Sequence, residues 1–107
     1  MSAPYQYLVL HKSCKNRPGV VACQAAHAAS ECIRTVPVSP ETHVCALEAE
    51  TSEDLEVLHE MLLVAGIHHV LIREPDGPYN GAAVALGVEP MDREKVKPYM
   101  TTFRVLR

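Results

Sequence analysis

The sequence predicts one small α/β domain, a three-layer α/β/α arrangement on a mixed four-stranded sheet with the element order β-α-β-α-β-β-α. Its 107 residues fit a single domain spanning residues 1–107. Short apolar runs of strand length alternate with two segments of helical spacing, which predicts βα units and a largely parallel core. A turn-rich segment between the last two runs adds one antiparallel neighbour, so the sheet should be mixed.

The first part of the chain predicts a strand followed by a helix. Residues 5–10 form an aromatic and aliphatic run typical of a buried strand, and residues 11–17 form a polar loop. Pro18 suits the first helical turn, because its missing N–H has no helical partner there in any case. Residues 19–34 have apolar side chains at three- and four-residue spacing, and prolines within residues 35–40 end this helix.

The middle of the chain repeats this order. Residues 43–49 predict a second strand, and Thr51 begins a capping sequence for a second helix. Gly66 is a natural C-terminal stop for that helix. Its apolar stripe consists of Leu55, Leu58, Leu62 and Ala65.

The remaining elements are shorter. Residues 68–73 predict a third strand, residues 75–81 a turn, and residues 82–88 a continuous apolar strand near the centre of the sheet. Pro90 is expected to open a short final helix. Alternation of apolar and charged residues over 103–105 permits a short last strand.

The charge balance limits how this protein can contact nucleic acid. A net charge of −3 argues against binding through overall charge, so we expect no DNA partner. RNA contact would need a local basic patch, and the candidate patch consists of His11, Lys12, Lys15 and Arg17. The alternative interpretation of these residues is a solvated loop.

The cysteine pattern and the start of the chain predict a cytoplasmic protein with reduced thiols. The four cysteines form no CxxC pair, the first residues do not resemble a secretory signal, and no apolar run reaches membrane-spanning length. His59 is followed by Glu60 but by Leu63 where HExxH needs histidine, so we expect no metal. Nucleotide-binding glycine motifs are absent, and we expect no cofactor.

Two places could carry chemistry. Gln24 and His27 are three residues apart on the polar side of the first helix, and a histidine there can act as base, acid or donor near neutral pH. Glu74 ends the third strand, where ligands of open α/β sheets usually bind. The alternatives are a surface histidine on an amphipathic helix and a solvated glutamate.

Several segments resemble the archaeal and eukaryotic peptidyl-tRNA hydrolases. The segment GVVACQAAHAASE, residues 19–31, is similar to the family's first-helix motif, and YLVL and VALGVEP are similar to two of its strands. The resemblance extends from about Tyr5 to the C-terminus and is closest to the subfamily of peptidyl-tRNA hydrolase domain-containing proteins.

The resemblance implies hydrolysis of the ester between a peptide and tRNA, with the tRNA acceptor end as partner and a homodimer as a common assembly. It implies catalytic roles for Gln24, His27 and Glu74, the last in place of an aspartate. Lys12, Lys15 and Arg17 would contact tRNA. The family's helix lysine is replaced by Val20, and its threonines are replaced within residues 82–84.

These replacements leave three functions open. The chain could be a hydrolase in which Lys15 compensates for the missing lysine. It could be an inactive or weak module that still binds tRNA or a protein. It could also be a structural or dimerisation domain without any link to RNA, because fold does not fix function.

Overall fold

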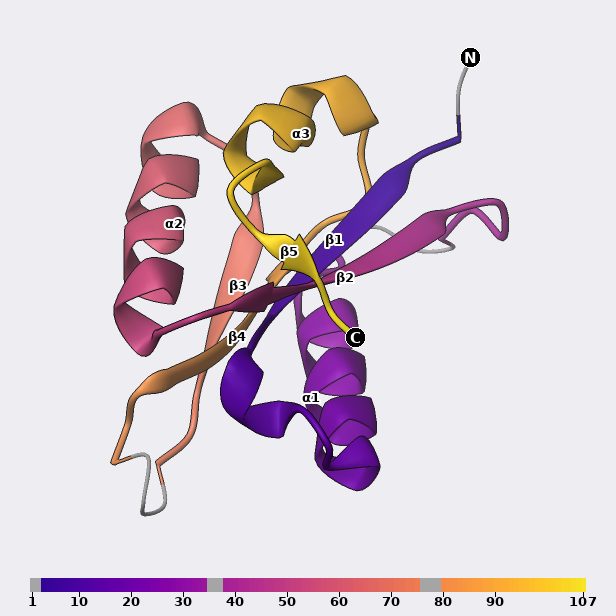
Figure 1. The fold of residues 1–107 in the computed structure, drawn as a ribbon. Coiled ribbons are helices and arrows are strands. Elements are labelled where there is room, and N and C mark those ends of the chain that lie inside the picture. The colour runs from indigo at the N-terminus through magenta and orange to yellow at the C-terminus, as the bar shows by residue number, and fades with distance from the viewer. Residues whose placement is uncertain (1–2, 35–37, 76–79) are drawn as a thin grey trace.

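A computed structural model describes residues 3–34, 38–75 and 80–107 and shows an α/β domain with three α-helices and one mixed sheet (Figure 1). The elements are β1 (Tyr5–His11), a 3-10 helix (Lys12–Cys14), α1 (Pro18–Glu31), β2 (His43–Ala49), α2 (Ser52–Ala65), β3 (His69–Arg73), β4 (Ala83–Val88), α3 (Arg93–Met100) and β5 (Arg104–Val105). No helix among the described residues is long and apolar enough to cross a bilayer.

The sheet has the strand order β3-β4-β1-β2-β5. The α/β class and the mixed sheet are confirmed, but the expected four strands are wrong, since Arg104–Val105 adds a fifth beside β2. The largely parallel core is also wrong. Among the described strands only β1 and β2 pair in parallel, because the β3–β4 hairpin places β4 antiparallel between β3 and β1.

Two apolar clusters pack on β1. Leu8 and Leu10 belong to the cluster that contains Ala28 of α1, whereas Tyr7 and Val9 belong to the cluster that includes α2 and α3 side chains. Successive residues of a strand point to opposite sides of its sheet. The two clusters therefore lie on opposite sides of β1, with α1 in one and α2 and α3 in the other.

The C-terminal segment contacts both clusters. Phe103 packs against the α2 and α3 cluster, and Leu106 packs against the α1 cluster. Between them, β5 pairs with β2, and the Leu106 N–H donates to the Ala46 carbonyl at 3.0 Å. The segment thus crosses the outer edge of β2.

Helix ends follow capping chemistry more closely than the apolar pattern. The Thr51 hydroxyl accepts from the Asp54 N–H, and Gly66 has a φ of 71°, which confirms both predicted ends of α2. The helix α1 ends at Glu31 rather than at residue 34. The helix α3 begins after Asp92 rather than at Pro90, because the Asp92 carboxylate caps the Glu94 N–H. Residues 76–79 of the predicted 75–81 turn lie outside the described residues.

The helix α1 packs closely against the sheet at Gly87 of β4. A Cβ atom at this position would lie 2.8 Å from the Ala28 carbonyl carbon and 3.3 Å from its Cα. Ala28 is fully buried. The small side chains of α1 and this glycine therefore let the helix backbone rest almost directly on the strand.

A histidine pair joins α2 to β3. His59 Nδ1 lies 2.8 Å from His69 Nε2, and His69 Nδ1 lies 2.8 Å from the Ile67 carbonyl. Since that carbonyl can only accept, His69 Nδ1 donates to it and His69 Nε2 accepts from His59. Burial lowers the pKa of His69 below its ordinary value of 6.5.

Acidification should therefore destabilise the fold. The folded protein binds the His69 proton more weakly than the unfolded chain does, so the free energy of unfolding falls as the pH drops below about 6.5. Urea unfolding across pH 5–8 measures this. A His69→Gln variant should show a flatter profile, with His43→Gln, at an exposed histidine, as its control. Identical pH dependence in all three proteins would contradict the assignment.

Candidate functional site

The carboxyl end of β1 leads into the basic loop and the start of α1. β3 runs in the same direction as β1, because both are antiparallel to β4. Glu74, which follows β3, therefore lies at the same end of the sheet as the start of α1, and Figure 1 shows the last residues of β3 and the first residues of β4 at that end. This is the edge at which ligands of α/β sheets usually bind.

Gln24 and His27 lie on one side of α1, beside the residues Ala25 and Ala28 that pack in the α1 cluster. Gln24 is half-buried and His27 is exposed, with His27 Nε2 3.7 Å from Glu31 Oε1. Arg34 follows His27 by seven residues and binds Glu89 at 2.6 Å. Because α1 ends at Glu31, this ion pair joins the segment after the helix to the residue that follows β4.

The three candidate catalytic residues lie at different levels along the sheet. Glu74 is half-buried and continues the pairing of Arg73 with Ala83, since its N–H donates to the Ala82 carbonyl at 3.1 Å. His27 adjoins Ala28, which packs on Gly87. Ala83 and Gly87 are about 13 Å apart along β4 at the usual strand rise. A substrate contacting both His27 and Glu74 would therefore have to extend along α1, past Gln24.

The two loop lysines are held by carboxylates of β2 and its end. Lys12 Nζ lies 2.7 Å from Glu50 Oε2, and Lys15 Nζ lies 3.2 Å from Glu48 Oε1. The hydrogen bond to Glu50 raises the pKa of Lys12 and lowers that of Glu50. Sequence spacing alone showed no acid near these lysines, because the acids come from a strand more than thirty residues later.

This arrangement bears on the idea that Lys15 replaces the missing helix lysine. Glu48 belongs to β2, while Glu74 follows β3, and β1 and β4 lie between these strands. Three strand spacings amount to about 14 Å. In its ion pair with Glu48, Lys15 is held at β2, three strands away from the β3 strand that Glu74 follows.

Loss of Lys15 should reduce stability. Glu48 is only 7% exposed, so Lys15→Ala leaves a buried carboxylate without its lysine. We expect the free energy of unfolding to fall by about 1–2 kcal/mol in urea titrations. The matched variant Lys12→Ala breaks an exposed pair and should have a smaller effect. Equal losses in the two variants would show that burial of Glu48 is not the cause.

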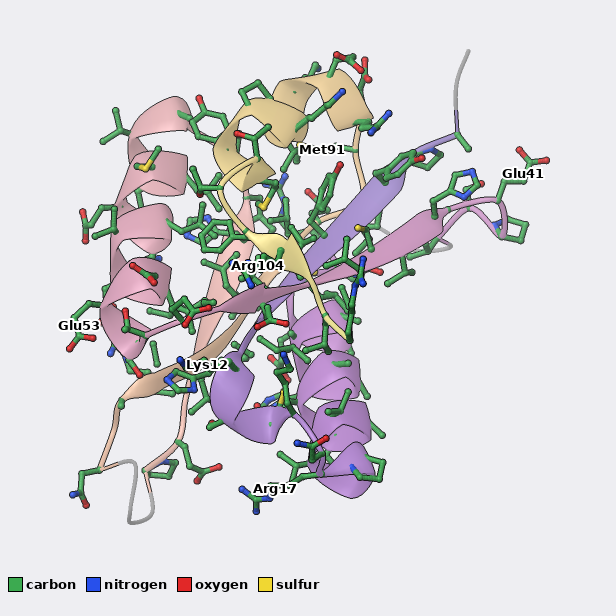
Figure 2. All side chains as sticks on the ribbon, in the orientation of Figure 1. Lys12, Arg17, Glu41, Glu53, Met91 and Arg104 are labelled. Atoms are coloured by element: carbon green, nitrogen blue, oxygen red, sulfur yellow. The ribbon has the colours of Figure 1, made fainter. Side chains whose placement is uncertain are left out.

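Arg17 is the remaining candidate for tRNA contact. It is exposed at the N-cap of α1, where its carbonyl accepts from the Val21 N–H, and it lies at the outside of the molecule (Figure 2). A helix N-terminus favours anions. Arg17 is thus placed where a phosphate would meet both its guanidinium and the start of the helix.

The positions that lack the family's polar groups are packed with apolar side chains. Val20 and Val84 belong to the α1 cluster. Ala83 is 1% exposed, and its carbonyl accepts from the Ser52 hydroxyl at 2.8 Å. The end of the sheet at which Glu74 lies is therefore less polar than the family resemblance implies.

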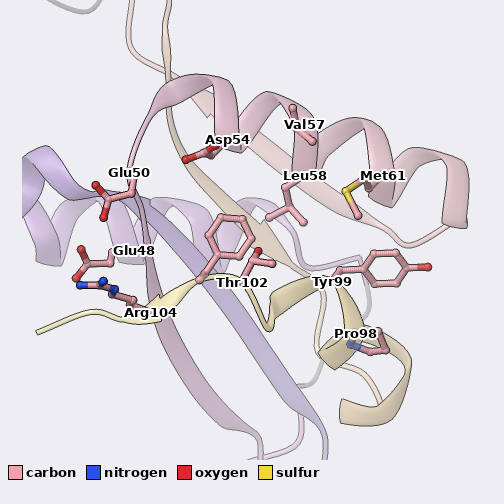
Figure 3. Close-up of a pocket in the computed structure, with 11 residues that line it drawn as sticks. Glu48, Glu50, Asp54, Val57, Leu58, Met61, Pro98, Tyr99, Thr102 and Arg104 are labelled. Atoms are coloured by element: carbon pink, nitrogen blue, oxygen red, sulfur yellow. The ribbon is translucent and has the colours of Figure 1, made fainter.

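Sequence reasoning missed a groove of about 890 Å³ between α2, α3 and β5 (Figure 3). We call it the α2–α3 groove; its lining residues are Glu48, Glu50, Asp54, Val57, Leu58, Met61, Pro98, Tyr99, Thr102, Phe103 and Arg104. The sequence feature that could have indicated this groove is the presence of Val57 and Met61, which are apolar but lie outside the leucine stripe of α2. Gln24, His27 and Glu74 do not line this groove.

A metal site finds no support among the described residues, which contain no group of three metal-binding side chains. The four cysteines are free thiols, and burial raises the pKa of Cys14 and Cys32. These two thiols are therefore poor nucleophiles at neutral pH.

Comparison with known proteins gives one match. A search of curated proteins found no match. A family model described as peptidyl-tRNA hydrolase PTH2 matches residues 5–106. This match spans all the described helices and strands, including the α1 segment with Gln24 and His27. The chain therefore belongs to the peptidyl-tRNA hydrolase PTH2 family.

Proposed function

We propose that this protein hydrolyses the ester bond between a peptide, or an N-blocked amino acid, and tRNA. The observation that carries the proposal is the family match over residues 5–106, which includes Gln24 and His27 on one side of α1. Glu74 lies at the end of the sheet where this helix begins. These groups can orient water and accept a proton.

In the proposed reaction, water attacks the ester carbonyl while Glu74 accepts its proton. The tetrahedral intermediate collapses, the bond to the ribose oxygen breaks, and that oxygen receives the proton that Glu74 accepted as tRNA leaves. Gln24, between the two ends of the site, orients the water or the carbonyl. His27, farther along α1, contacts the terminal ribose.

Binding of tRNA in this proposal uses phosphate contacts at the start of α1. Arg17 is exposed there, and Lys12 and Lys15 contribute only when their pairs with Glu50 and Glu48 are exchanged for phosphate. Phosphate contacts release counterions, so binding should weaken as salt is raised.

A catalytically weak or inactive binding module is the second candidate. Val20 stands where the family has a lysine, and Val84 and Ala83 are packed where hydroxyls are expected. A missing preorganised charge typically lowers an enzymatic rate by about two to three orders of magnitude. Binding of tRNA without turnover would favour this candidate.

The test is single-turnover hydrolysis of a defined N-blocked aminoacyl-tRNA beside a tRNA binding assay. Variants His27→Ala and Glu74→Gln should each lower the rate by about a hundredfold if these groups act in catalysis. The matched control is His43→Ala, which removes an exposed histidine near the amino end of β1. An unchanged rate in both site variants would refute the proposed catalytic group.

Three further expectations belong to this proposal. Free thiols on all four cysteines are compatible with a reducing, cytoplasmic location. The separate apolar clusters of α1 and of α2 and α3 support the three-layer arrangement. A homodimer stays a prediction, which sedimentation velocity can test.

A further inference from the structure

The ion pair between Lys12 and Glu50 lies on the surface of the molecule. Lys12 Nζ is 2.7 Å from Glu50 Oε2, and the two side chains are 49% and 57% exposed. An exposed pair of this kind contributes little to stability, because water solvates both charges well when they separate. Lys12 can therefore exchange Glu50 for another anion with little loss to the fold.

The neighbouring pair between Lys15 and Glu48 is different. Lys15 Nζ is 3.2 Å from Glu48 Oε1, and the Glu48 side chain is only 7% exposed. Departure of Lys15 would leave this buried carboxylate without its cation, which is far more costly than the separation of an exposed pair. Of the two loop lysines, Lys12 is therefore the one that an incoming anion can take over.

Glu50 occupies the position in which a phosphate would neutralise Lys12. Its carboxylate accepts a hydrogen bond from the Lys12 ammonium group, and this hydrogen bond is the largest cause of the lowered pKa of Glu50. Glu50 is thus ionised at neutral pH. A phosphate oxygen that approaches the same ammonium group meets a like charge at close range, and the repulsion weakens phosphate binding for as long as Glu50 remains there.

The charged groups around Glu50 have an excess of cations. Arg104 and Lys15 both lie close enough to lower the pKa of Glu50 further through their charges. Together with Lys12 they provide three cations against the two carboxylates Glu48 and Glu50. Neutralising Glu50 therefore raises the excess positive charge of this cluster from one unit to two, without altering any cation.

Lys12 belongs to the end of the sheet at which α1 begins. It opens the 3-10 helix that follows β1, and Arg17 is the N-cap of α1 five residues later. Both side chains come from the same loop, and both residues are exposed. An RNA backbone that contacts Arg17 therefore has a second exposed cation within the same loop.

We propose that Lys12 contacts a phosphate of the bound tRNA and that Glu50 competes with this phosphate for the Lys12 ammonium group. This inference rests on the proposed function, in which tRNA is part of the substrate, and it adds a residue that sets the affinity. On binding, the Glu50 carboxylate separates from Lys12 and turns into water, while Lys15 stays with Glu48. The affinity for tRNA is consequently lower than the cations of the loop would give by themselves, and re-formation of the pair favours departure of the tRNA product.

Fluorescence anisotropy of labelled, deacylated tRNA tests this competition. Glu50→Gln keeps the size of the side chain but removes its charge, and it should raise the affinity for tRNA about fivefold. The slope of log affinity against log salt should become steeper by up to about one, because Lys12 then neutralises a phosphate without exposing a new anion. The matched control Glu41→Gln removes an exposed charge at the opposite end of β2 (Figure 2) and should change the affinity by less than about twofold.

A double-mutant cycle identifies the lysine on which Glu50 acts. In the background of Lys12→Ala, the Glu50→Gln change should no longer raise the affinity by more than the Glu41→Gln control does. Lys12→Ala itself should weaken tRNA binding about twofold in the unaltered protein and about tenfold in the Glu50→Gln protein, in which the lysine is available to phosphate from the start. Thermal unfolding checks that every variant is folded, which is expected because the Lys12–Glu50 pair is exposed.

The outcomes separate this inference from the proposed hydrolysis. Equal affinities of Glu50→Gln and Glu41→Gln, or a gain that persists without Lys12, would overturn the inference and leave the hydrolase proposal unaffected. A selective gain in Glu50→Gln, with no ester hydrolysis by any variant, would support the competition and refute the hydrolase. Absence of tRNA binding by every variant at low salt would overturn both.

Discussion

Replacement of Gly87 by alanine is expected to destabilise the protein by about 3 kcal/mol. The added Cβ would lie 2.8 Å from the Ala28 carbonyl carbon, and the opposing atoms are helix backbone rather than a flexible side chain. Ala28 is fully buried, so α1 can relieve the overlap only by moving away from the sheet. Total stabilities of such domains are about 5–15 kcal/mol, which makes this loss a large fraction.

Thermal and urea unfolding measure the effect of Gly87→Ala, with a fall in Tm of more than about 10 °C expected. The matched control is Gly19→Ala in α1, where a Cβ would have no atom within 4 Å. That change should leave stability unchanged or raise it by up to about 1 kcal/mol, because alanine favours helices over glycine. Similar stability in the two variants would mean that α1 does not rest on β4 as described.

Replacement of Val20 by lysine is expected to raise the rate of peptidyl-tRNA hydrolysis by about a hundredfold. Val20 lies in the first turn of α1, in the same apolar cluster as Ile72 and Val84 near the end of the sheet that carries Glu74. An ammonium group there would stabilise negative charge that develops on the ester oxygen. Lys15 does not provide this charge in the structure, because it pairs with Glu48 at β2.

Single-turnover rates of Val20→Lys should be compared with those of Ala22→Lys, which adds the same charge at an exposed position of the same helix. Both lysines interact unfavourably with the helix N-terminus and should lower stability. Unfolding measurements therefore check that the two variants are folded to a similar extent under the conditions of the rate measurement. Faster ester hydrolysis in both variants would reflect only a stronger electrostatic attraction between the protein and tRNA. No increase in either would favour the binding module over a hydrolase limited by its missing lysine.

Both ends of α2 were predicted correctly from the sequence, because short-range interactions determine them. Thr51 and Gly66 specify its ends through short-range hydrogen bonds and a left-handed backbone, so neighbouring residues carry the information. Strand pairing could not be predicted in this way. The insertion of β4 between β1 and β3 depends on which apolar strands meet in space, and two consecutive βα units suggest a parallel neighbour instead.

The candidate site was predictable in its residue types but not in its geometry. The three-residue spacing of Gln24 and His27 places them on one side of α1, which the sequence shows directly. The levels of His27 and Glu74 depend on the packing of Ala28 on Gly87, which no local pattern encodes. The neutralisation of Lys12 and Lys15 likewise depends on the register of β2 beside β1.

The crossing of β2 by the C-terminal segment has a consequence for solubility. An uncovered strand edge offers unpaired amide and carbonyl groups to any other chain, which promotes runaway assembly into fibres. The β5 pairing and the Leu106 bond to Ala46 occupy part of that edge. Two residues of strand and one further hydrogen bond thus oppose aggregation along this edge, and they do not extend to Val44, which is 60% exposed.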